Sequence, residues 1–244
     1  MKKLICIFLL LFILPSQVFA YREVPILVYH SIDEFKGHGS KELYVTPENF
    51  EKQMIYLRDH GFTLLTFDRW KDVHKVNKPI FITFDDGYKN NLNAFAIFQK
   101  LQTDQFTPTG TIFVISDFIG RSNRLSIADL KMIAASNLIS IQSHTATHPD
   151  LTKIKNEEYE FELRESKDKI QRITEKPVIA LSYPYGNTND KVVAETKKYY
   201  LFGLTTTTEL FLEKNRKDEL YLLPRLYIKY STTLDEFAKI VNGI

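Results

Sequence analysis

The chain has 244 residues, 44% of them hydrophobic, which is enough for one large domain or two small ones with a substantial core. Its 32 basic and 30 acidic residues give a formal net charge of only +2, so the composition shows none of the strong basicity of nucleic-acid-binding chains. The single Cys excludes an intramolecular disulfide framework.

The N-terminus has the pattern of a secretory signal peptide. Lys2 and Lys3 precede an apolar run over residues 4–14, and Val18-Phe19-Ala20 resembles a cleavage site. The run is too short to span a bilayer, which needs about 20 apolar residues. We therefore predict a signal over residues 1–20 and one domain over residues 21–244, secreted or held in the cell envelope, at the cell surface or in a periplasm. An uncleaved membrane anchor is the alternative.

Cleavage would leave thirty basic and thirty acidic residues and no Cys. The mature chain would then carry a formal charge near zero and no thiol chemistry. We expect no nucleic-acid partner and no transmembrane span after signal cleavage. Protein partners are not predicted by the sequence.

Strands and helices are predicted to alternate along the rest of the chain. Apolar runs predict strands at residues 24–32, 64–67, 80–84, 111–115, 138–141, 178–182, 202–206 and 222–228. Capping residues and helical periodicity predict helices at 47–60, 90–101, 127–136, 156–173 and 189–200, and a last one after Thr233. No linker divides the chain. The alternation indicates an α/β domain, either a barrel or a doubly wound sheet, with its chemistry at the carboxyl ends of the strands.

Two adjacent carboxylates end one of these strands. Pro79-Ile80-Phe81-Ile82-Thr83-Phe84 stops at Asp85-Asp86-Gly87. Neighbouring Asp side chains repel, and desolvating them is costly unless a cation or hydrogen-bond donors compensate. A turn at Gly87 would let both reach one site. The alternative is an ordinary turn followed by a helix cap.

A pair of histidines follows another strand, in Ser143-His144-Thr145-Ala146-Thr147-His148. The i, i+4 spacing would place both rings on one face of a helical turn, and Pro149 predicts that the turn is not a long regular helix. Two imidazoles and one carboxylate form a three-ligand set that leaves a catalytic metal one open position. The second carboxylate could then act as a base. Chance spacing is the alternative.

Three further features lie near strand ends. Of the four His outside that pair, only His30 ends a buried strand, where it could serve the site or be a core histidine. Tyr183-Pro184-Tyr185-Gly186 could form an aromatic wall with a backbone N–H turned into the site, or an ordinary turn. Arg225 could pair with an active-site carboxylate or be a surface cation.

Together these motifs resemble the polysaccharide deacetylase family, also called the NodB-homology or carbohydrate esterase 4 family. Residues 83–87 (TFDDG) match its first motif and residues 143–148 (SHTATH) its second, in the same order and separation. The resemblance extends from about Val24 to Ile228. Residues 25–32 (PILVYHSI) and 182–186 (SYPYG) look most like the branch that deacetylates poly-β-1,6-N-acetylglucosamine of biofilm exopolysaccharide.

The resemblance implies a single distorted (β/α) barrel of about seven parallel strands and a divalent metal, most often Zn²⁺. Carried over by motif, the metal ligands are Asp86, His144 and His148. Asp85 becomes the general base, and the Tyr185 backbone N–H binds the oxyanion.

Two departures from the family pattern affect the remaining roles. Ser182 stands where the third motif usually begins with an Arg that orients the base, so Arg225 is the candidate replacement. No His follows His148, although the family usually places its general acid late in the chain. In the exopolysaccharide branch a histidine near the N-terminus has that role, and His30 matches it.

The resulting hypothesis is a secreted, metal-dependent polysaccharide deacetylase that hydrolyses N-acetyl groups of N-acetylglucosamine units, with the acetylated polysaccharide as its partner. The alternatives are deacetylation of peptidoglycan amino sugars or O-acetylated xylan. An alternative of a different class is a non-catalytic glycan-binding module.

Overall fold

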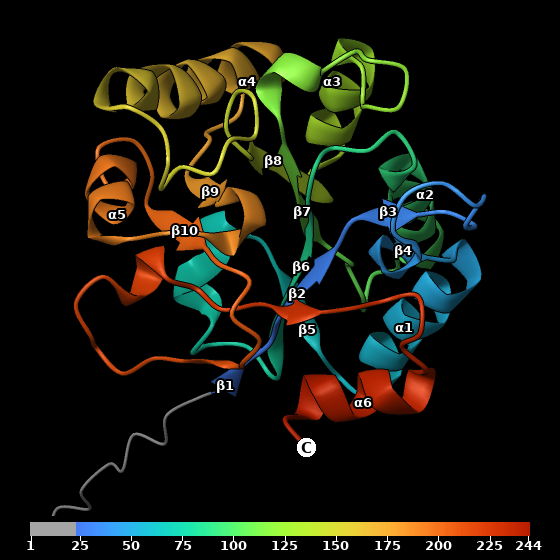
Figure 1. Cartoon of the computed structure of the whole chain (residues 1–244). Helices are drawn as coiled ribbons and strands as arrows, with labels where there is room; N and C mark the ends of the chain where they lie inside the picture. The colour runs from blue at the N-terminus through green and yellow to red at the C-terminus, as the bar shows by residue number, and fades with distance from the viewer. Residues whose placement is uncertain (1–22) are drawn as a thin grey trace, which may run out of the picture.

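The structure is a computed structural model that describes residues 23–244; the predicted signal segment lies outside the described residues. Its centre is an eight-stranded sheet curled into a barrel (Figure 1). Seven strands follow one path, in the order β10 (Phe202–Leu204), β9 (Ala180–Ser182), β8 (Ile139–Ser143), β7 (Gly110–Val114), β6 (Pro79–Phe84), β2 (Ile26–Tyr29) and β12 (Leu226–Tyr227). The eighth, β5 (Thr63–Leu65), pairs with β6. Every pairing in this sheet is parallel, which confirms the predicted distorted (β/α) barrel.

A short late segment lies between the two edges of the sheet. Leu223 forms an isolated parallel bridge with Leu204 of β10, and β12 then pairs with β2. Two backbone hydrogen bonds, Leu223 N to Gly203 O at 3.0 Å and Thr205 N to Leu223 O at 2.9 Å, hold the first contact. Residues 223–227 therefore connect both edges of the barrel, and Arg225 lies between them.

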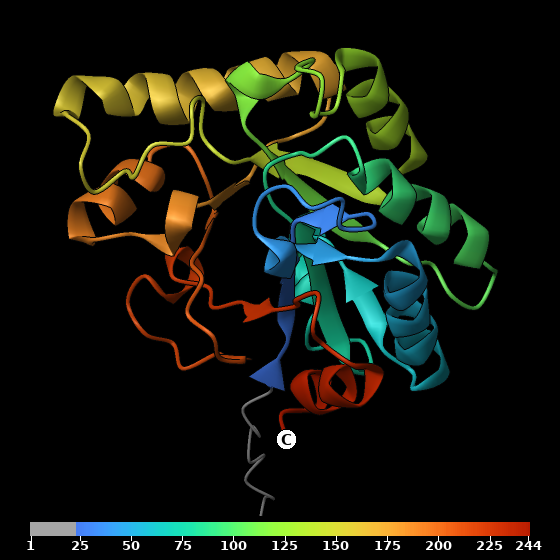
Figure 2. The same cartoon turned by 45° about the vertical axis from the view of Figure 1, so that its right-hand side comes forward.

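Helices cover the outside of the sheet (Figure 2). They are α1 (Pro47–Asp59), α2 (Asn91–Leu101), α3 (Ile127–Ser136), α4 (Ser166–Thr174), α5 (Asp190–Thr196) and α6 (Leu234–Asn242). The predicted caps are present: Thr46 accepts from the Asn49 N–H, and both Ser126 and Thr233 form capping boxes. Among residues 23–244, none of the helices combines the length and the apolar character that crossing a bilayer requires.

Side chains alternate between two apolar clusters. On β6, Ile80, Ile82 and Phe84 pack with the outer helices, whereas Phe81 packs inside the barrel. Ile26 of β2 and Ala180 of β9 belong to the same inner cluster. Because successive residues of a strand face opposite sides, this alternation fixes which positions point into the barrel at the carboxyl ends of the strands.

Two predicted elements are divided in the structure. The expected strand over residues 24–32 is three short strands, β1 (Glu23–Val24), β2 and β3 (Ser31–Ile32); β1 pairs with β11 (Phe211–Leu212) and β3 with β4 (Tyr44–Val45). The expected helix over 156–173 is a 3₁₀ turn, η4 (Asn156–Glu158), a π-helix, η5 (Glu160–Glu165), and then α4. An amphipathic pattern does not distinguish these hydrogen-bond spacings, so sequence alone cannot locate the π-helix.

Gly203 of β10 is a steric requirement on the outer face of the sheet. A Cβ there would lie 2.7 Å from Tyr183 Cζ and 2.8 Å from Tyr221 O. We predict that Gly203→Ala lowers the free energy of unfolding by about 3 kcal/mol, because the surrounding backbone must move. Gly120→Ala, at a positive φ but with no atom within 4 Å of the added Cβ, should cost only about 1 kcal/mol. Urea unfolding of both variants measures the difference, and equal losses would contradict the steric explanation.

Candidate active site

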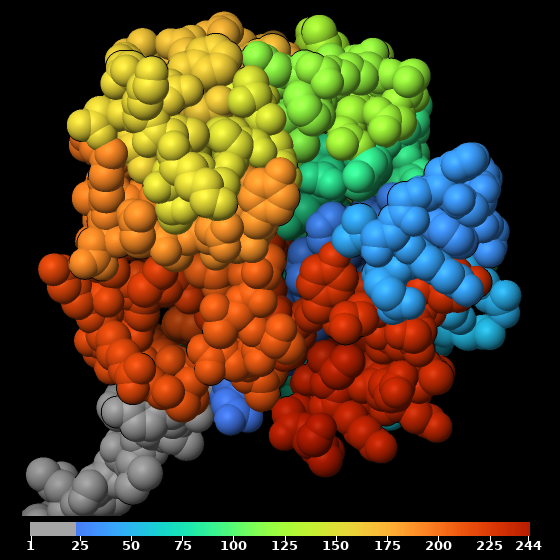
Figure 3. Space-filling view, in the orientation of Figure 1, coloured from blue at the N-terminus to red at the C-terminus, as the bar shows by residue number. Residues whose placement is uncertain are grey.

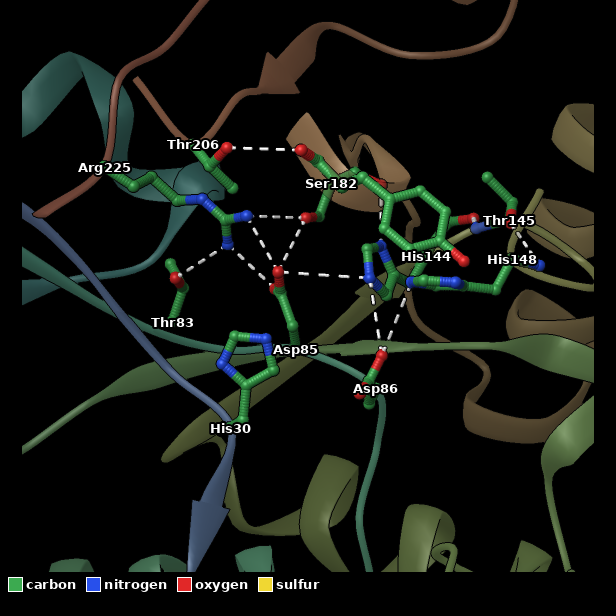
Figure 4. Close-up of polar contacts among 12 residues, drawn as sticks. His30, Thr83, Asp85, Asp86, His144, Thr145, His148, Ser182, Thr206 and Arg225 are labelled. Carbon is green, nitrogen blue, oxygen red and sulfur yellow. Dashed lines mark hydrogen bonds and ion pairs between the residues drawn. The ribbon is translucent and has the colours of Figure 1, made fainter. Parts of the chain in front are cut away.

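The alternation of the strands brings polar side chains together at one end of the barrel. His30 follows β2, Asp85 follows β6, His144 follows β8, and Ser182 ends β9. Each side chain points into the barrel. His30, Asp85 and Ser182 are an even number of residues after the inward-facing Ile26, Phe81 and Ala180 of the same strands. Figure 4 shows these residues around one centre.

Asp85 and Arg225 form a buried ion pair at this centre. Arg225 Nη1 and Nη2 each donate to one Asp85 carboxylate oxygen at 2.8 Å, and the two residues are 0% and 3% exposed. This bidentate geometry is the strongest form of an Arg–carboxylate contact. Because Arg225 is fully buried, it is not the surface cation that the sequence allowed as an alternative.

Neighbouring groups satisfy the rest of the guanidinium. Arg225 Nε donates to Thr205 O at 2.9 Å, Nη2 to Ser182 Oγ at 2.9 Å and Nη1 to Thr83 Oγ1 at 3.3 Å. Ser182 Oγ in turn donates to Asp85 Oδ2 at 3.1 Å. The serine that stands in place of the family arginine therefore contacts both members of the ion pair.

The pair determines the charge state of Asp85. Burial raises the pKa of the carboxyl, but the charge of Arg225 and its hydrogen bonds hold that pKa well below the usual range. Asp85 is therefore a carboxylate that can accept a proton but has none to donate.

A left-handed turn brings the second aspartate into the same site. Asp86 has φ 71° and Gly87 has φ 62°, which interrupts the strand alternation so that consecutive carboxylates both face the centre. A Cβ on Gly87 would lie 2.8 Å from Val114 Cγ1. Gly87 is thus required both by its conformation and by the space available.

The two histidines lie on an irregular loop and not on one face of a helical turn as expected. Thr145 and His148 have φ 66° and 68°, and the His144 and His148 rings meet edge to face with centroids 4.7 Å apart. Left-handed residues end any helical turn, and the loop turns the two rings toward Asp86 instead. His144 Nε2 lies 3.6 Å and His148 Nε2 3.7 Å from Asp86 Oδ1.

This donor set fits a divalent metal. One ligand atom from each of Asp86, His144 and His148 lies within 4.8 Å of the others, and no other such group of His, Cys, Asp and Glu occurs among residues 23–244. Donors around a tetrahedral zinc at about 2.0–2.2 Å are roughly 3.3–3.6 Å apart, close to the two measured Nε2–Oδ1 separations.

The protonation of the imidazoles also suits metal binding. His144 Nδ1 donates to the Ser182 carbonyl at 2.8 Å, which leaves the Nε2 lone pair directed at the site. Burial, the largest cause, lowers the pKa of His148 to about 4. The first observation directs the His144 lone pair into the site, and the second favours the neutral form that His148 needs as a metal ligand.

His30 lies across the carboxylates from His148 (Figure 4). Its Nδ1 is 3.2 Å from Tyr227 Oη, the two rings lie 5.4 Å apart, and its carbonyl accepts from Asn91 Nδ2 at 2.6 Å. Burial lowers the pKa of His30, and Asp85 and Asp86 partly oppose that shift. His30 is half-buried at the mouth of the barrel, not enclosed in the core.

The Tyr183–Gly186 segment places only one aromatic ring at the site. Tyr183 is buried among the outer apolar residues, whereas Tyr185 is 64% exposed, with its ring 4.8 Å from that of His148. Tyr185 has φ 61°, and its carbonyl accepts from Thr206 Oγ1 at 3.3 Å. A Cβ on Gly186 would lie 2.6 Å from Thr206 N, so glycine keeps this turn against its neighbour.

The mouth of the barrel is hollowed on the surface. Figure 3 shows darker blue atoms of the N-terminal strands at the bottom of a depression between the orange segment near residue 185, the red segment near residue 230 and the blue segment near residue 40. A polymer chain could lie across this depression and present a side group to the centre.

Sequence reasoning missed two kinds of contributor. Tyr227 was not singled out, although it lies two residues from Arg225 on the segment that closes the barrel. Glu162 lies within the helix predicted over residues 156–173, where a Glu would be expected to face solvent, yet it is only 5% exposed and contacts the histidine loop. Its place between Phe161 and Leu163 in an otherwise charged stretch was the one available signal.

Comparison with known proteins agrees with this geometry. A sequence model of the family described as Polysaccharide deacetylase matches residues 72–202. A Bacillus subtilis (strain 168) protein, YxkH, provisionally named a polysaccharide deacetylase, is 31% identical over 91% of this chain and 77% of its own. The crystal structure of BC0361, a polysaccharide deacetylase from Bacillus cereus, superposes with a TM-score of 0.88 at 51% identity, over 91% of this chain and 69% of that one.

A more distant relative has a named substrate. The poly-β-1,6-N-acetyl-D-glucosamine N-deacetylase of Staphylococcus epidermidis is 29% identical over 68% of this chain and 64% of its own length. The chain belongs to the polysaccharide deacetylase family. It is a hydrolase of acetyl groups on a polysaccharide.

We predict that Arg225→Leu destabilises the fold by about 3–5 kcal/mol, because it leaves Asp85 buried without its cation. Adding Asp85→Asn to Arg225→Leu should restore part of the lost stability, because the double variant no longer buries an uncompensated charge. Arg216→Leu, at an exposed position, is the matched control and should change stability by less than about 0.5 kcal/mol. Denaturant unfolding measures all three, and equal stability of the two leucine variants would show that the ion pair does not stabilise the barrel.

Proposed function

We propose that this chain is a secreted, metal-dependent N-deacetylase of N-acetylglucosamine units, acting on poly-β-1,6-N-acetylglucosamine. The observation that carries the proposal is the convergence of Asp86, His144 and His148 beside a second, ionised carboxylate. The signal-like pattern of residues 1–20 supports secretion. The Staphylococcus epidermidis relative supports the choice of polymer.

Asp86, His144 and His148 would hold the metal, with Zn²⁺ the best match to one carboxylate and two imidazoles. A divalent ion bound there supplies Lewis-acid polarisation of the acetyl carbonyl and a water of lowered pKa. The chain itself then has three tasks: to accept a proton, to bind the developing oxyanion and to protonate the leaving nitrogen.

Asp85 is assigned as the base that accepts the proton of the attacking water. Its carboxylate Oδ2 lies 3.9 Å from His144 Nε2, so it borders the ligand set without being one of the three donors. Arg225 and Ser182 hold both oxygens in place and keep the group ionised. Arg225 is thus assigned as the residue that orients the base.

Tyr185, which lies beside His148, is assigned two contributions. Its backbone N–H would donate to the acetyl oxygen as negative charge develops, a contact worth about 3–4 kcal/mol in other acyl-transfer sites. Its exposed ring beside His148 offers a face on which a sugar ring can stack.

His30 is assigned as the acid that donates a proton to the leaving amine. Tyr227 Oη at Nδ1 fixes the ring, so that Nε2 is the atom left for the substrate. Because burial lowers its pKa, protonated His30 is a stronger acid than free histidine but is protonated in a smaller fraction of molecules.

We predict that Asp85→Asn and His30→Gln separate base from acid. On N-acetylglucosamine oligomers each should lower kcat by about 10²–10⁴-fold while the metal stays bound. On p-nitrophenyl acetate, whose leaving group needs no proton, only Asp85→Asn should remain strongly impaired. Acetate release and metal content are measured for both variants. A His30→Gln enzyme equally impaired on both substrates would reject its role as acid, and an active Asp85→Asn enzyme would reject the base.

The polymer is tested by acetate release from three substrates. We expect the fastest release from poly-β-1,6-N-acetylglucosamine, slower release from peptidoglycan glycans and the slowest from O-acetylated xylan, and chelation should abolish all three. Preferred release from peptidoglycan or xylan would replace the proposed substrate. Glycan binding that survives chelation, with no acetate released from any polymer, would indicate a binding module.

A further inference from the structure

The loop that carries the two histidines is held by contacts from several elements. His144 N donates to Val114 O at 2.9 Å, and the Thr145 and Ala146 carbonyls accept from residues 116 and 117 at 3.1 and 3.0 Å. His148 N donates to Thr145 Oγ1 at 3.0 Å. The N–H groups of Ala146 and Thr147, which lie between the two histidines, donate to no backbone carbonyl among residues 23–244.

Both of those N–H groups donate to one side chain. Glu162 Oε2 accepts from Ala146 N and from Thr147 N, each at 2.9 Å, and Glu162 Oε1 accepts from Thr147 Oγ1 at 2.5 Å. Glu162 is 5% exposed, and within residues 23–244 it forms no ion pair. A buried carboxylate normally requires a cation, so here the three donors of the loop are its only compensation.

This side chain comes from the π-helix that precedes α4. Glu162 lies in η5 (Glu160–Glu165), and Ser166 begins α4 one turn later. Ser166 Oγ lies 2.9 Å from Ser143 Oγ, which accepts from Thr145 N at 3.2 Å. One helix therefore holds the loop at two points, and isolated π turns of this kind are frequent at functional sites.

The loop needs such support because its backbone is strained. Thr145 and His148 are both non-glycine residues at positive φ, each of which costs about 1–2 kcal/mol relative to a right-handed conformation. Without partners for the Ala146 and Thr147 N–H groups, a right-handed turn would relieve this strain and rotate the His148 ring away from Asp86. The carboxylate of Glu162 stabilises the conformation in which both Nε2 atoms face the aspartate.

We propose that Glu162 is a positioning residue for the metal site, which it preorganises by anchoring the backbone between His144 and His148. The inference rests on the proposed function, because the metal ligands are assigned there. Glu162 acts through the loop: its hydrogen bonds go to Ala146 and Thr147 and not to the donor atoms of His144 or His148.

The test compares Glu162→Ala with Glu162→Gln and with Glu160→Ala. Glu160 lies on the same π-helix, is exposed and pairs with Arg164 at 2.8 Å, so it serves as the matched control. Zn²⁺ affinity is measured by competition with a chelator, and the visible absorption spectrum of the Co²⁺-loaded protein reports ligand geometry. Acetate release is then measured at saturating Zn²⁺.

We expect Glu162→Ala to weaken Zn²⁺ binding about 10–100-fold and to change the Co²⁺ spectrum, as loss of an outer partner of a ligand does. Glu162→Gln should restore most of the affinity. Its amide oxygen can accept from both backbone N–H groups, while the Thr147 hydroxyl turns to accept from the amide NH₂. Glu160→Ala should match the wild type in every measurement.

Wild-type Zn²⁺ affinity and Co²⁺ spectrum in Glu162→Ala would overturn the inference. If that variant does not fold, Thr147→Val replaces it: loss of one donor should weaken Zn²⁺ binding about five-fold, and unchanged affinity would overturn the inference equally. A wild-type protein that binds no Zn²⁺ would reject the proposed metal site itself, so the two failures are distinguishable.

Discussion

The buried contact between Asp85 and Arg225 is the interaction on which the rest of the site depends. Arg225 belongs to the segment that touches both edges of the barrel, so closing the sheet also delivers the cation to the carboxylate. Without that cation, burial and the neighbouring Asp86 carboxylate would both favour the protonated acid, which could not accept a proton. Ser182 links the pair to β9, and its carbonyl fixes the tautomer of His144. Barrel closure, the charge of the proposed base and the orientation of one proposed metal ligand thus depend on the same network of contacts.

At the mouth of the barrel, regular strands position some side chains of the site and turns with positive φ position the others. Strand alternation alone aims Asp85 and His144 inward, because they continue the inner sets of β6 and β8. Asp86, His148 and Tyr185 are different, since each has a positive φ and reaches the site only because its backbone leaves the regular path. Such conformations persist where neighbours fix them, here through the contacts at Gly87, Gly186 and Glu162. Asp86, His148 and Tyr185 therefore depend on the surrounding structure, which must keep their backbone in the left-handed conformation.

The sequence predicted what local patterns encode. Apolar runs, caps and the β/α alternation led to an α/β domain, and the family resemblance selected the parallel barrel that the structure has. The Asp85-Asp86-Gly87 and His144/His148 motifs led to residues that the fold brings together. Local pattern alone left Arg225 open between a surface cation and the partner of a carboxylate, because it is 140 residues from Asp85 in the chain. Only the family resemblance made it the candidate that orients the base. Glu162 escaped notice because a helical charge pattern looks the same whether one carboxylate faces solvent or a loop. The i, i+4 spacing predicts a helical turn at residues 144–148, where the structure has an irregular loop, because spacing does not report backbone φ.

The charges at the site give a reason for combining these groups. When the imidazoles are neutral, Asp85, Asp86 and Arg225 sum to a single negative charge around a buried ion pair. A divalent ion on the proposed ligands would reverse that sign, so the site would favour negative charge developing on the acetyl oxygen. The free amine produced by deacetylation is cationic near neutral pH, and a net positive centre would repel it once His30 has donated its proton. Under the proposed mechanism, Arg225 therefore has two effects. It keeps the base ionised before the reaction, and its positive charge favours release of the cationic product.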